Sequence, residues 1–240
     1  MQATAQKSVY DFDISLQPDY ALLSVQLKAG EQIFAEPSSM ASMDENIHLK
    51  AGLKGGMFKS VKRMFGGESM VVNTFTAQNT GGEVTFAPGP MGDLHHYHLD
   101  GTGIMLERGA FVAHSPGVDL DAKFQGLKGF FSGEGLMMLK ASGTGDIFFN
   151  TYGAAIEVDV SGDYVVDTGY VLAFEDTLNY RISTLSGLTP GQSVKSFFFG
   201  GEGLVCNFSG QGKLWVQTRA LAPYLRWVHP YRRTKKSNNN

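Results

Sequence analysis

Apolar and polar residues alternate along many short stretches of this chain, which is the pattern of β-strands with one buried face and one solvated face. The alternation is strictest at 156–160, where the sequence reads Ile-Glu-Val-Asp-Val. It is also clear at 10–14 and at 21–27. These stretches predict an all-β protein built from hairpins.

A short phrase that begins Gly-Glu returns three times, at 67–69, 133–135 and 201–203, and each copy opens an alternating run. Each run is followed by a group of small residues that predicts a turn. These groups lie at 79–82, 142–145 and 209–212. The regular spacing predicts three tandem β units, because a unit of this size is marginal alone and gains stability by stacking on its neighbours.

The repeats define the expected domain organisation. The first β unit, with the N-terminal strand and a basic amphipathic loop, is expected at 1–92, the second at 93–153 and the third at 154–219. Residues 220–240 are rich in basic and polar side chains, so they are expected to form a disordered basic tail.

Acidic residues recur at equivalent positions of the repeats. One set precedes a small-residue break between two short apolar runs, and the other lies in the Gly-Glu phrases. The first set is Glu36, Glu107 and Asp167, and the second is Glu68, Glu134 and Glu202. We interpret both sets as acceptors for backbone amides in turns, because Asp and Glu near a turn commonly have that role, and we assign no catalytic residue among them.

Composition narrows the function classes. The 240 residues are 42% hydrophobic and 18% charged, as in an ordinary globular protein, and the formal net charge of −3 argues against a dedicated nucleic-acid binder. The single cysteine, Cys206, excludes an intrachain disulfide and lies in an apolar run, so a packed thiol is expected. The chain has no apolar run of membrane-spanning length, which favours a cytoplasmic location with peripheral membrane association as the open alternative.

The loop at 57–65 places Phe58 and Phe65 on an apolar face and Lys59, Lys62 and Arg63 around it. This pattern predicts a short basic amphipathic helix. Its apolar face would cover the end of a β barrel, or it would dock on a membrane surface or on another protein.

Histidines cluster at 95–98, where alternation along a strand places His96 and His98 on one face. Such a pair begins the metal site of cupins, but Gly103 occupies the position where a cupin places a glutamate. We therefore interpret the segment as a surface or interface strand, with a metal site at His96 and His98 as the alternative. No cofactor is predicted.

Several phrases together resemble one family. They are Glu-Pro-Ser-Ser-Met at 36–40, the segment ending Arg-Met-Phe-Gly-Gly-Glu at 63–68, and the two later Gly-Glu-Gly phrases. Through these phrases the chain resembles the altered inheritance of mitochondria protein 24 family. The resemblance extends from about residue 10 to about residue 219. The resemblance implies a fold like that of the tryptophan RNA-binding attenuator protein: three tandem β units, related to the double-stranded β-helix, stacked as part of a ring. It brings no catalytic residues.

A ring that reads RNA needs a basic residue at one register of every unit, whereas Lys54 and Lys128 are matched by Thr189 in the third unit. Nucleic acid is therefore not the expected partner. The sequence predicts a non-catalytic oligomeric binding or scaffold protein, a homotrimer that docks on a membrane surface or another protein. The alternatives are a metal-dependent cupin-like enzyme using His96 and His98, and an RNA-binding ring protein.

Overall fold

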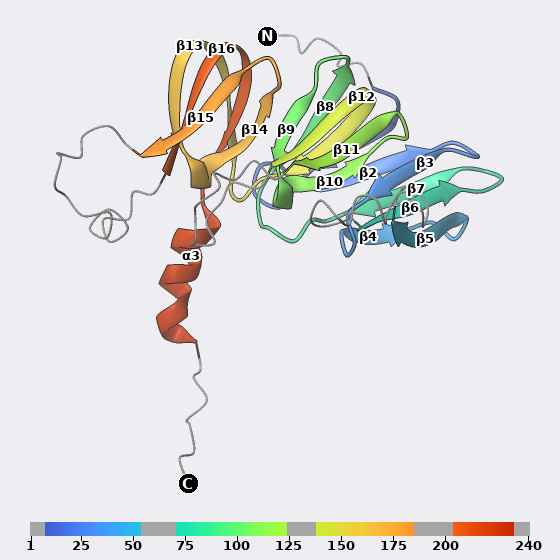
Figure 1. Ribbon diagram of the computed structural model, residues 1–240. Helices are drawn as coiled ribbons and strands as arrows, with labels where there is room; N and C mark the ends of the chain where they lie inside the picture. The colour runs from blue at the N-terminus through green and yellow to red at the C-terminus, as the bar shows by residue number, and fades with distance from the viewer. Residues whose placement is uncertain (1–7, 54–70, 124–137, 185–203, 233–240) are drawn as a thin grey trace, which may run out of the picture.

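The computed structural model describes residues 8–53, 71–123, 138–184 and 204–232. Within these ranges most of the regular structure is β-strand, so the predicted β class is confirmed. Figure 1 shows three groups of strands that follow one another along the chain, with one α-helix projecting from them. The Gly-Glu phrases with Glu68, Glu134 and Glu202, and the 57–65 loop with its predicted basic helix, lie outside the described residues.

The strands are short in the first half of the chain and become long in the second half. In the first group β1 spans Asp11–Ser15, β2 Leu22–Leu27, β3 Gln32–Ala35, β4 Met40–Met43, β5 Ile47–Leu53, β6 Val71–Ala77 and β7 Gly82–Phe86. The second group consists of β8 Leu94–Asp100, β9 Ile104–Glu107, β10 Phe111–His114, β11 Val118–Lys123 and β12 Met138–Asn150. The third consists of β13 Ala155–Asp167, β14 Val171–Glu175, β15 Asn179–Thr184 and β16 Leu204–Gln217.

The described strands form two sheets, and all their pairings are antiparallel. The smaller sheet has the order β1-β2-β7-β4. The larger runs β13-β16-β14-β9-β12-β10-β3-β6-β5, with β8 and β11 also paired to β12 and β15 paired to β16. Strand β12 therefore joins the first group of strands to the third.

Strands β12 and β16 contain 13 and 14 residues, and each changes partners near its middle. In β12 the change falls at Gly143 and Gly145, which have φ angles of 108° and 143°, and in β16 it falls near Gly210, with φ 111°. The prediction of turns at 142–145 and 209–212 is therefore wrong, since both groups lie inside continuous strands. Residues without a Cβ atom let a strand bend sharply without ending.

One irregularity recurs in all three groups of strands. The register shifts between Met40 and Ser42 in β4, between Phe111 and Ala113 in β10, and between Val171 and Ala173 in β14. In the second and third groups a short 3₁₀-helix precedes the shift, η1 at Arg108–Ala110 and η2 at Thr168–Tyr170. Each shift begins four residues after one of the recurring acidic residues Glu36, Glu107 and Asp167, so the sequence repeat has a matching backbone feature.

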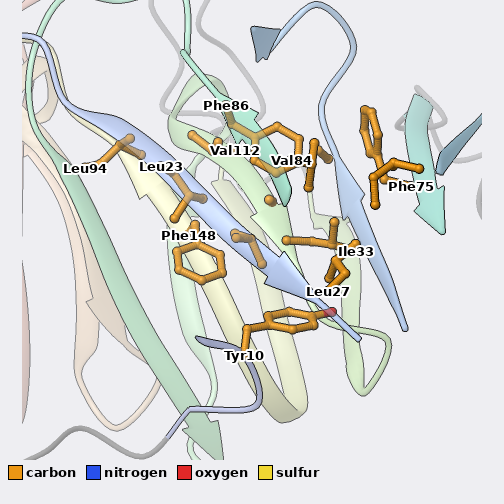
Figure 2. Close-up of a cluster of buried hydrophobic side chains, with 14 of the residues drawn as sticks. Tyr10, Leu23, Leu27, Ile33, Phe75, Val84, Phe86, Leu94, Val112 and Phe148 are labelled. Carbon is orange, nitrogen blue, oxygen red and sulfur yellow. The ribbon is translucent and has the colours of Figure 1, made fainter. Parts of the chain in front are cut away.

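Buried apolar side chains form three clusters along the molecule. Figure 2 shows the first, in which Leu23, Ile33 and Phe86 of the first group of strands meet Phe148 of β12. Tyr10, which precedes β1, lies in the same cluster, and its hydroxyl donates a hydrogen bond to the carbonyl of Gln32. Burial of this apolar surface is the main stabilising term for the contact between the N-terminal segment and β12.

The chain leaves the last strand through Ala220, which is buried, and enters helix α3 at Leu221–Val228, followed by the 3₁₀-helix η3 at His229–Tyr231. Pro223 lies in the first turn of α3, where a missing amide hydrogen is tolerated. The expectation of disorder throughout 220–240 is therefore wrong for this segment, and residues 233–240 lie outside the described part of the chain.

Candidate functional site

Two paired strands bring together a histidine pair and a carboxylate. Strand β8 presents His96 and His98 two residues apart, and β12 pairs with it so that Asp146 lies opposite His98. Nε2 of His96 lies 3.0 Å from Oδ1 of Asp146, and Nδ1 of His98 lies 2.7 Å from the same oxygen. Both imidazoles therefore converge on one carboxylate oxygen.

The second oxygen of Asp146 binds the N-terminal segment. Oδ2 accepts hydrogen bonds from the hydroxyl of Ser8 at 2.8 Å and from the backbone amides of Val9 at 2.6 Å and Tyr10 at 3.3 Å. The backbone amide of Asp146 in turn donates to the hydroxyl of Ser115 at 2.9 Å. Hydrogen bonds at Oδ2 and at the backbone amide therefore hold Asp146 in place without any ligand.

This cluster is buried. The side chain of Asp146 is 0% exposed, and those of His96 and His98 are 4% and 9% exposed. Burial alone would raise the pKa of Asp146, but the hydrogen bonds from His96, His98, Ser8 and Val9 outweigh it and hold that pKa well below its usual range. The carboxylate is therefore ionised at neutral pH in spite of its burial.

Two aromatic rings pack against His96. The ring of Phe12, from β1, lies 4.6 Å from the ring of His96 between centroids, and that of Phe148 lies 5.2 Å from it. These contacts fix the orientation of the His96 imidazole. Nε2 of His98, the ring nitrogen that faces away from Asp146, is buried and has no hydrogen-bond partner within the described chain.

His95 lies on the opposite face of β8. Its Nε2 is 3.4 Å from Oδ2 of Asp93, and its ring stacks on Phe149 at 5.6 Å. Burial lowers the pKa of His95, while Asp93 and Glu157 oppose this shift. The prediction that His95 lies on the other face of the strand from His96 and His98 is confirmed, because successive side chains of a strand point to opposite faces.

Sequence reasoning identified His96 and His98 and missed Asp146, which lies 50 residues after His96 in the chain. The missing signal was the pairing of β8 with β12, which only the folded chain provides. Within the described residues, His96, His98 and Asp146 are the one group of three His, Cys, Asp or Glu side chains close enough to share a metal ion, with ligand atoms within 4.8 Å of one another.

Cys206 has no reactive environment. It is fully buried in the third apolar cluster, and burial raises the pKa of its thiol to about 12. A thiol in this state is protonated and inert at neutral pH, as expected of a packed side chain.

Asp167, one of the recurring acidic residues, binds a backbone amide, because its carboxylate accepts a hydrogen bond from the amide of Gly169 at 2.8 Å. The side chain of Glu107 makes no such cap hydrogen bond in η1, although the nearby amide of Gly109 partly opposes the rise in its pKa that burial causes. The interpretation as an amide acceptor is confirmed for Asp167. Burial raises the pKa of Glu36, the counterpart of both residues in the first repeat, to about 7.

Helix α3 forms a separate candidate surface. Leu221, Leu225 and Trp227 are 60%, 53% and 64% exposed, and no residue of the helix is buried. Tyr224 of the helix contacts the connection between β12 and β13, where its ring lies 5.7 Å from that of Tyr152 in an edge-on arrangement. Figure 1 shows that α3 extends away from the strands beyond this point. No helix in the described part of the chain has the length and apolar character needed to cross a membrane.

Comparison with known proteins places this chain among relatives of unassigned function. An uncharacterized protein of Streptococcus pyogenes serotype M6 is 26% identical over 223 residues, which cover 89% of this chain and 87% of that relative. The X-ray crystal structure of a Streptococcus pyogenes protein superimposes with a TM-score of 0.77 at 23% identity, covering 93% of this chain and 100% of that one. The likeness supports the fold.

The family comparison agrees with the resemblance drawn from the repeated phrases. The model of the family described as Mitochondrial biogenesis AIM24 matches residues 12–219, which include all the strands from β2 to β16. The chain therefore belongs to the Mitochondrial biogenesis AIM24 family.

Proposed function

We propose that this protein is a non-catalytic oligomeric scaffold that docks on an anionic membrane surface through α3. The observation that carries the proposal is the exposed apolar side of this helix. Leu221, Tyr224, Leu225 and Val228 recur at intervals of three and four residues and therefore lie along one side. Arg226 falls on the opposite side of the helix at 100° per residue.

An apolar helix surface of this kind is costly in water unless another surface covers it. The aromatic residues favour a membrane interface as that surface, because Trp and Tyr place an apolar ring and a polar group at the boundary between lipid and water. Trp227 and Tyr231 are 64% and 77% exposed, and their rings lie 5.9 Å apart.

The distribution of charged residues along the chain favours an anionic membrane surface. From Arg219 to the end of the sequence six residues are basic and none is acidic, whereas the whole chain has 20 basic and 23 acidic residues. The basic residues thus concentrate at the end that carries α3, and the remainder of the chain is acidic. Each Lys or Arg near an anionic lipid surface contributes about 1 kcal/mol of binding free energy, which salt weakens.

The oligomeric part of the proposal rests on β13. This strand stands at the end of the strand order of the larger sheet, and Ile156, Tyr164 and Val165 on it are exposed. An open edge with apolar side chains invites pairing with another chain. The recurrence of one register shift in β4, β10 and β14 supports a tandem organisation of three attenuator-like units, which a closed ring of three chains would complete.

The metal-dependent enzyme remains the alternative, and burial argues against it. A catalytic ion must be reached by a substrate, whereas the side chains of His96 and His98 are 4% and 9% exposed and Asp146 is covered completely. An ion enclosed in this way is out of reach of a substrate, which argues against turnover.

Co-sedimentation with lipid vesicles tests the docking proposal. We expect the full chain to bind vesicles containing phosphatidylglycerol and to bind pure phosphatidylcholine vesicles much more weakly, with binding that falls as salt rises. Trp227→Ala should weaken binding about tenfold, since it removes a large interfacial side chain. Tyr20→Ala is the matched control, because Tyr20 is 68% exposed but lies far from α3 in the sequence.

A second variant separates the charge from the apolar contribution. Replacing Arg226 and Arg232 by glutamine should lower binding and flatten its salt dependence, while thermal unfolding stays unchanged. Equal binding to charged and neutral vesicles, or binding unaffected by Trp227→Ala, would contradict docking through α3. Binding to an acidic protein but to no vesicle would assign the helix to a protein partner instead.

A further inference from the structure

The structure assigns a second property to this protein, independent of membrane docking: we propose that His96, His98 and Asp146 bind a divalent transition-metal ion of the Zn²⁺ class. The site lies between β8 and β12, beneath β1 and the segment that precedes it. It shares no residue with α3, so the two proposals can fail separately.

The first support is the spacing of the ligand atoms. Nε2 of His96 and Nδ1 of His98 lie 3.0 Å and 2.7 Å from Oδ1 of Asp146, and all three atoms lie within 4.8 Å of one another. Ligand atoms that share a zinc ion at about 2.0–2.2 Å are themselves roughly 3–3.5 Å apart. Small side-chain adjustments therefore bring the three atoms to coordinating distance.

The second support is the number of hydrogen-bond donors on Asp146. A carboxylate has about four lone-pair sites, yet five groups approach this one. Ser8, Val9 and Tyr10 approach Oδ2, while the two imidazoles approach Oδ1. An ion on Oδ1 that accepts the imidazole lone pairs replaces two N–H donors with one bond, which leaves the carboxylate with four partners.

The third support is the surrounding shell. Carboxylate ligands are typically held by hydrogen bonds on the oxygen that does not face the ion, and Oδ2 of Asp146 is held in this way by the N-terminal segment. Phe12 and Phe148 fix the ring of His96 by direct contact. The ligand positions are therefore set by packing before an ion arrives.

The donor set also selects the kind of ion. Two imidazole nitrogens and one carboxylate oxygen suit Zn²⁺ and its neighbours Co²⁺ and Ni²⁺. Ca²⁺ and Mg²⁺ require about six or more oxygen ligands, many of them from water, which a cluster this buried does not supply. We therefore expect Zn²⁺ and Co²⁺ to bind and Mg²⁺ not to bind.

Calorimetric titration of the untagged full chain, stripped of metal with a chelator, tests the site. We expect one Zn²⁺ per chain, a rise in melting temperature with Zn²⁺ and none with Mg²⁺. His96→Gln and His98→Gln should each weaken Zn²⁺ binding at least tenfold. His95→Gln is the matched control on the opposite face of the same strand, and His48→Gln controls for an exposed histidine.

Co²⁺ supplies a readout that needs no variant. Its visible absorption in the wild-type protein should report nitrogen and oxygen ligands, without the charge-transfer band of a thiolate from Cys206. If the wild-type chain binds neither Zn²⁺ nor Co²⁺, the proposal is overturned. This outcome does not depend on whether the variants fold. Stoichiometric binding that survives both His96→Gln and His98→Gln would overturn it as well, and the cluster would then be a hydrogen-bonded anchor for the N-terminal segment.

Discussion

The hydroxyl of Ser8 donates a hydrogen bond of 2.8 Å to Oδ2 of Asp146, 138 residues further along the chain. This contact joins the beginning of the described chain to the middle of β12. The amides of Val9 and Tyr10 reinforce it, and Tyr10 then packs into the first apolar cluster. One buried carboxylate therefore organises the N-terminal segment, the histidine pair and the bend of β12 together.

Asp146→Asn should lower the free energy of unfolding by about 3 kcal/mol, because it removes a buried charge from groups that are arranged to donate to it. Urea denaturation in metal-free buffer measures the change. Asp119→Asn is the control, since Asp119 is an exposed acid on the adjacent strand β11 and its replacement should change stability little. Equal effects of the two substitutions would show that the buried network contributes nothing.

Gly145→Ala should cost about 2–4 kcal/mol in stability, since two effects combine at this position. Gly145 has φ 143°, and a Cβ atom there would lie 2.1 Å from the hydroxyl oxygen of Ser115, which also holds the amide of Asp146. Gly101→Ala is the matched variant, because Gly101 has φ 117° and open space around its missing Cβ. The difference between the two melting curves isolates the steric contribution.

Much of the fold could be read from the alternation of apolar and polar residues. The strict alternation at 156–160 lies within β13, and the runs at 10–14 and 21–27 overlap β1 and β2. Alternation also put His96 and His98 on one face. Asp146 could not be found in this way, because its role depends on the register of two strands that the sequence does not pair.

Two errors have particular physical causes. The small residues around Gly210 predict a turn, but Gly210 lies opposite Gly162 in a continuous ladder, where the absence of side chains lets both strands bend together. The basic composition of the C-terminal segment predicts a disordered tail, but the spacing of Leu221, Leu225 and Val228 is that of one helix face, and this segment forms α3.

Glu36→Gln should change the pH dependence of stability. Burial raises the pKa of Glu36 to about 7, so the folded protein binds a proton there that the unfolded chain, with an ordinary pKa near 4.5, releases between these values. Wild-type stability therefore falls as the pH rises through this window, whereas the glutamine variant lacks that contribution. The variant should gain on the order of 1 kcal/mol relative to wild type between pH 5 and pH 8, after allowance for partial solvent exposure.

Chemical denaturation at several pH values measures this difference, and comparison with the wild type cancels the titration of all other groups. Glu45→Gln provides the control, because Glu45 is exposed. A stability difference between Glu36→Gln and wild type that stays constant from pH 5 to pH 8 would show that Glu36 does not titrate differently in the folded state.

Self-association through β13 gives the last prediction. Ile156 and Val165 are 55% and 52% exposed on a strand at the end of the larger sheet, and a lysine on such an edge is a common means of preventing strand pairing between chains. Light scattering should give three times the mass of one chain for the wild type, and Val165→Lys should shift the protein toward the mass of a single chain. Val71→Lys is the control, because Val71 is 45% exposed but β6, which contains it, is paired on both sides by β3 and β5. A wild-type protein that stays monomeric at micromolar concentration would contradict the trimer, and a trimer unaffected by Val165→Lys would place its interface away from β13.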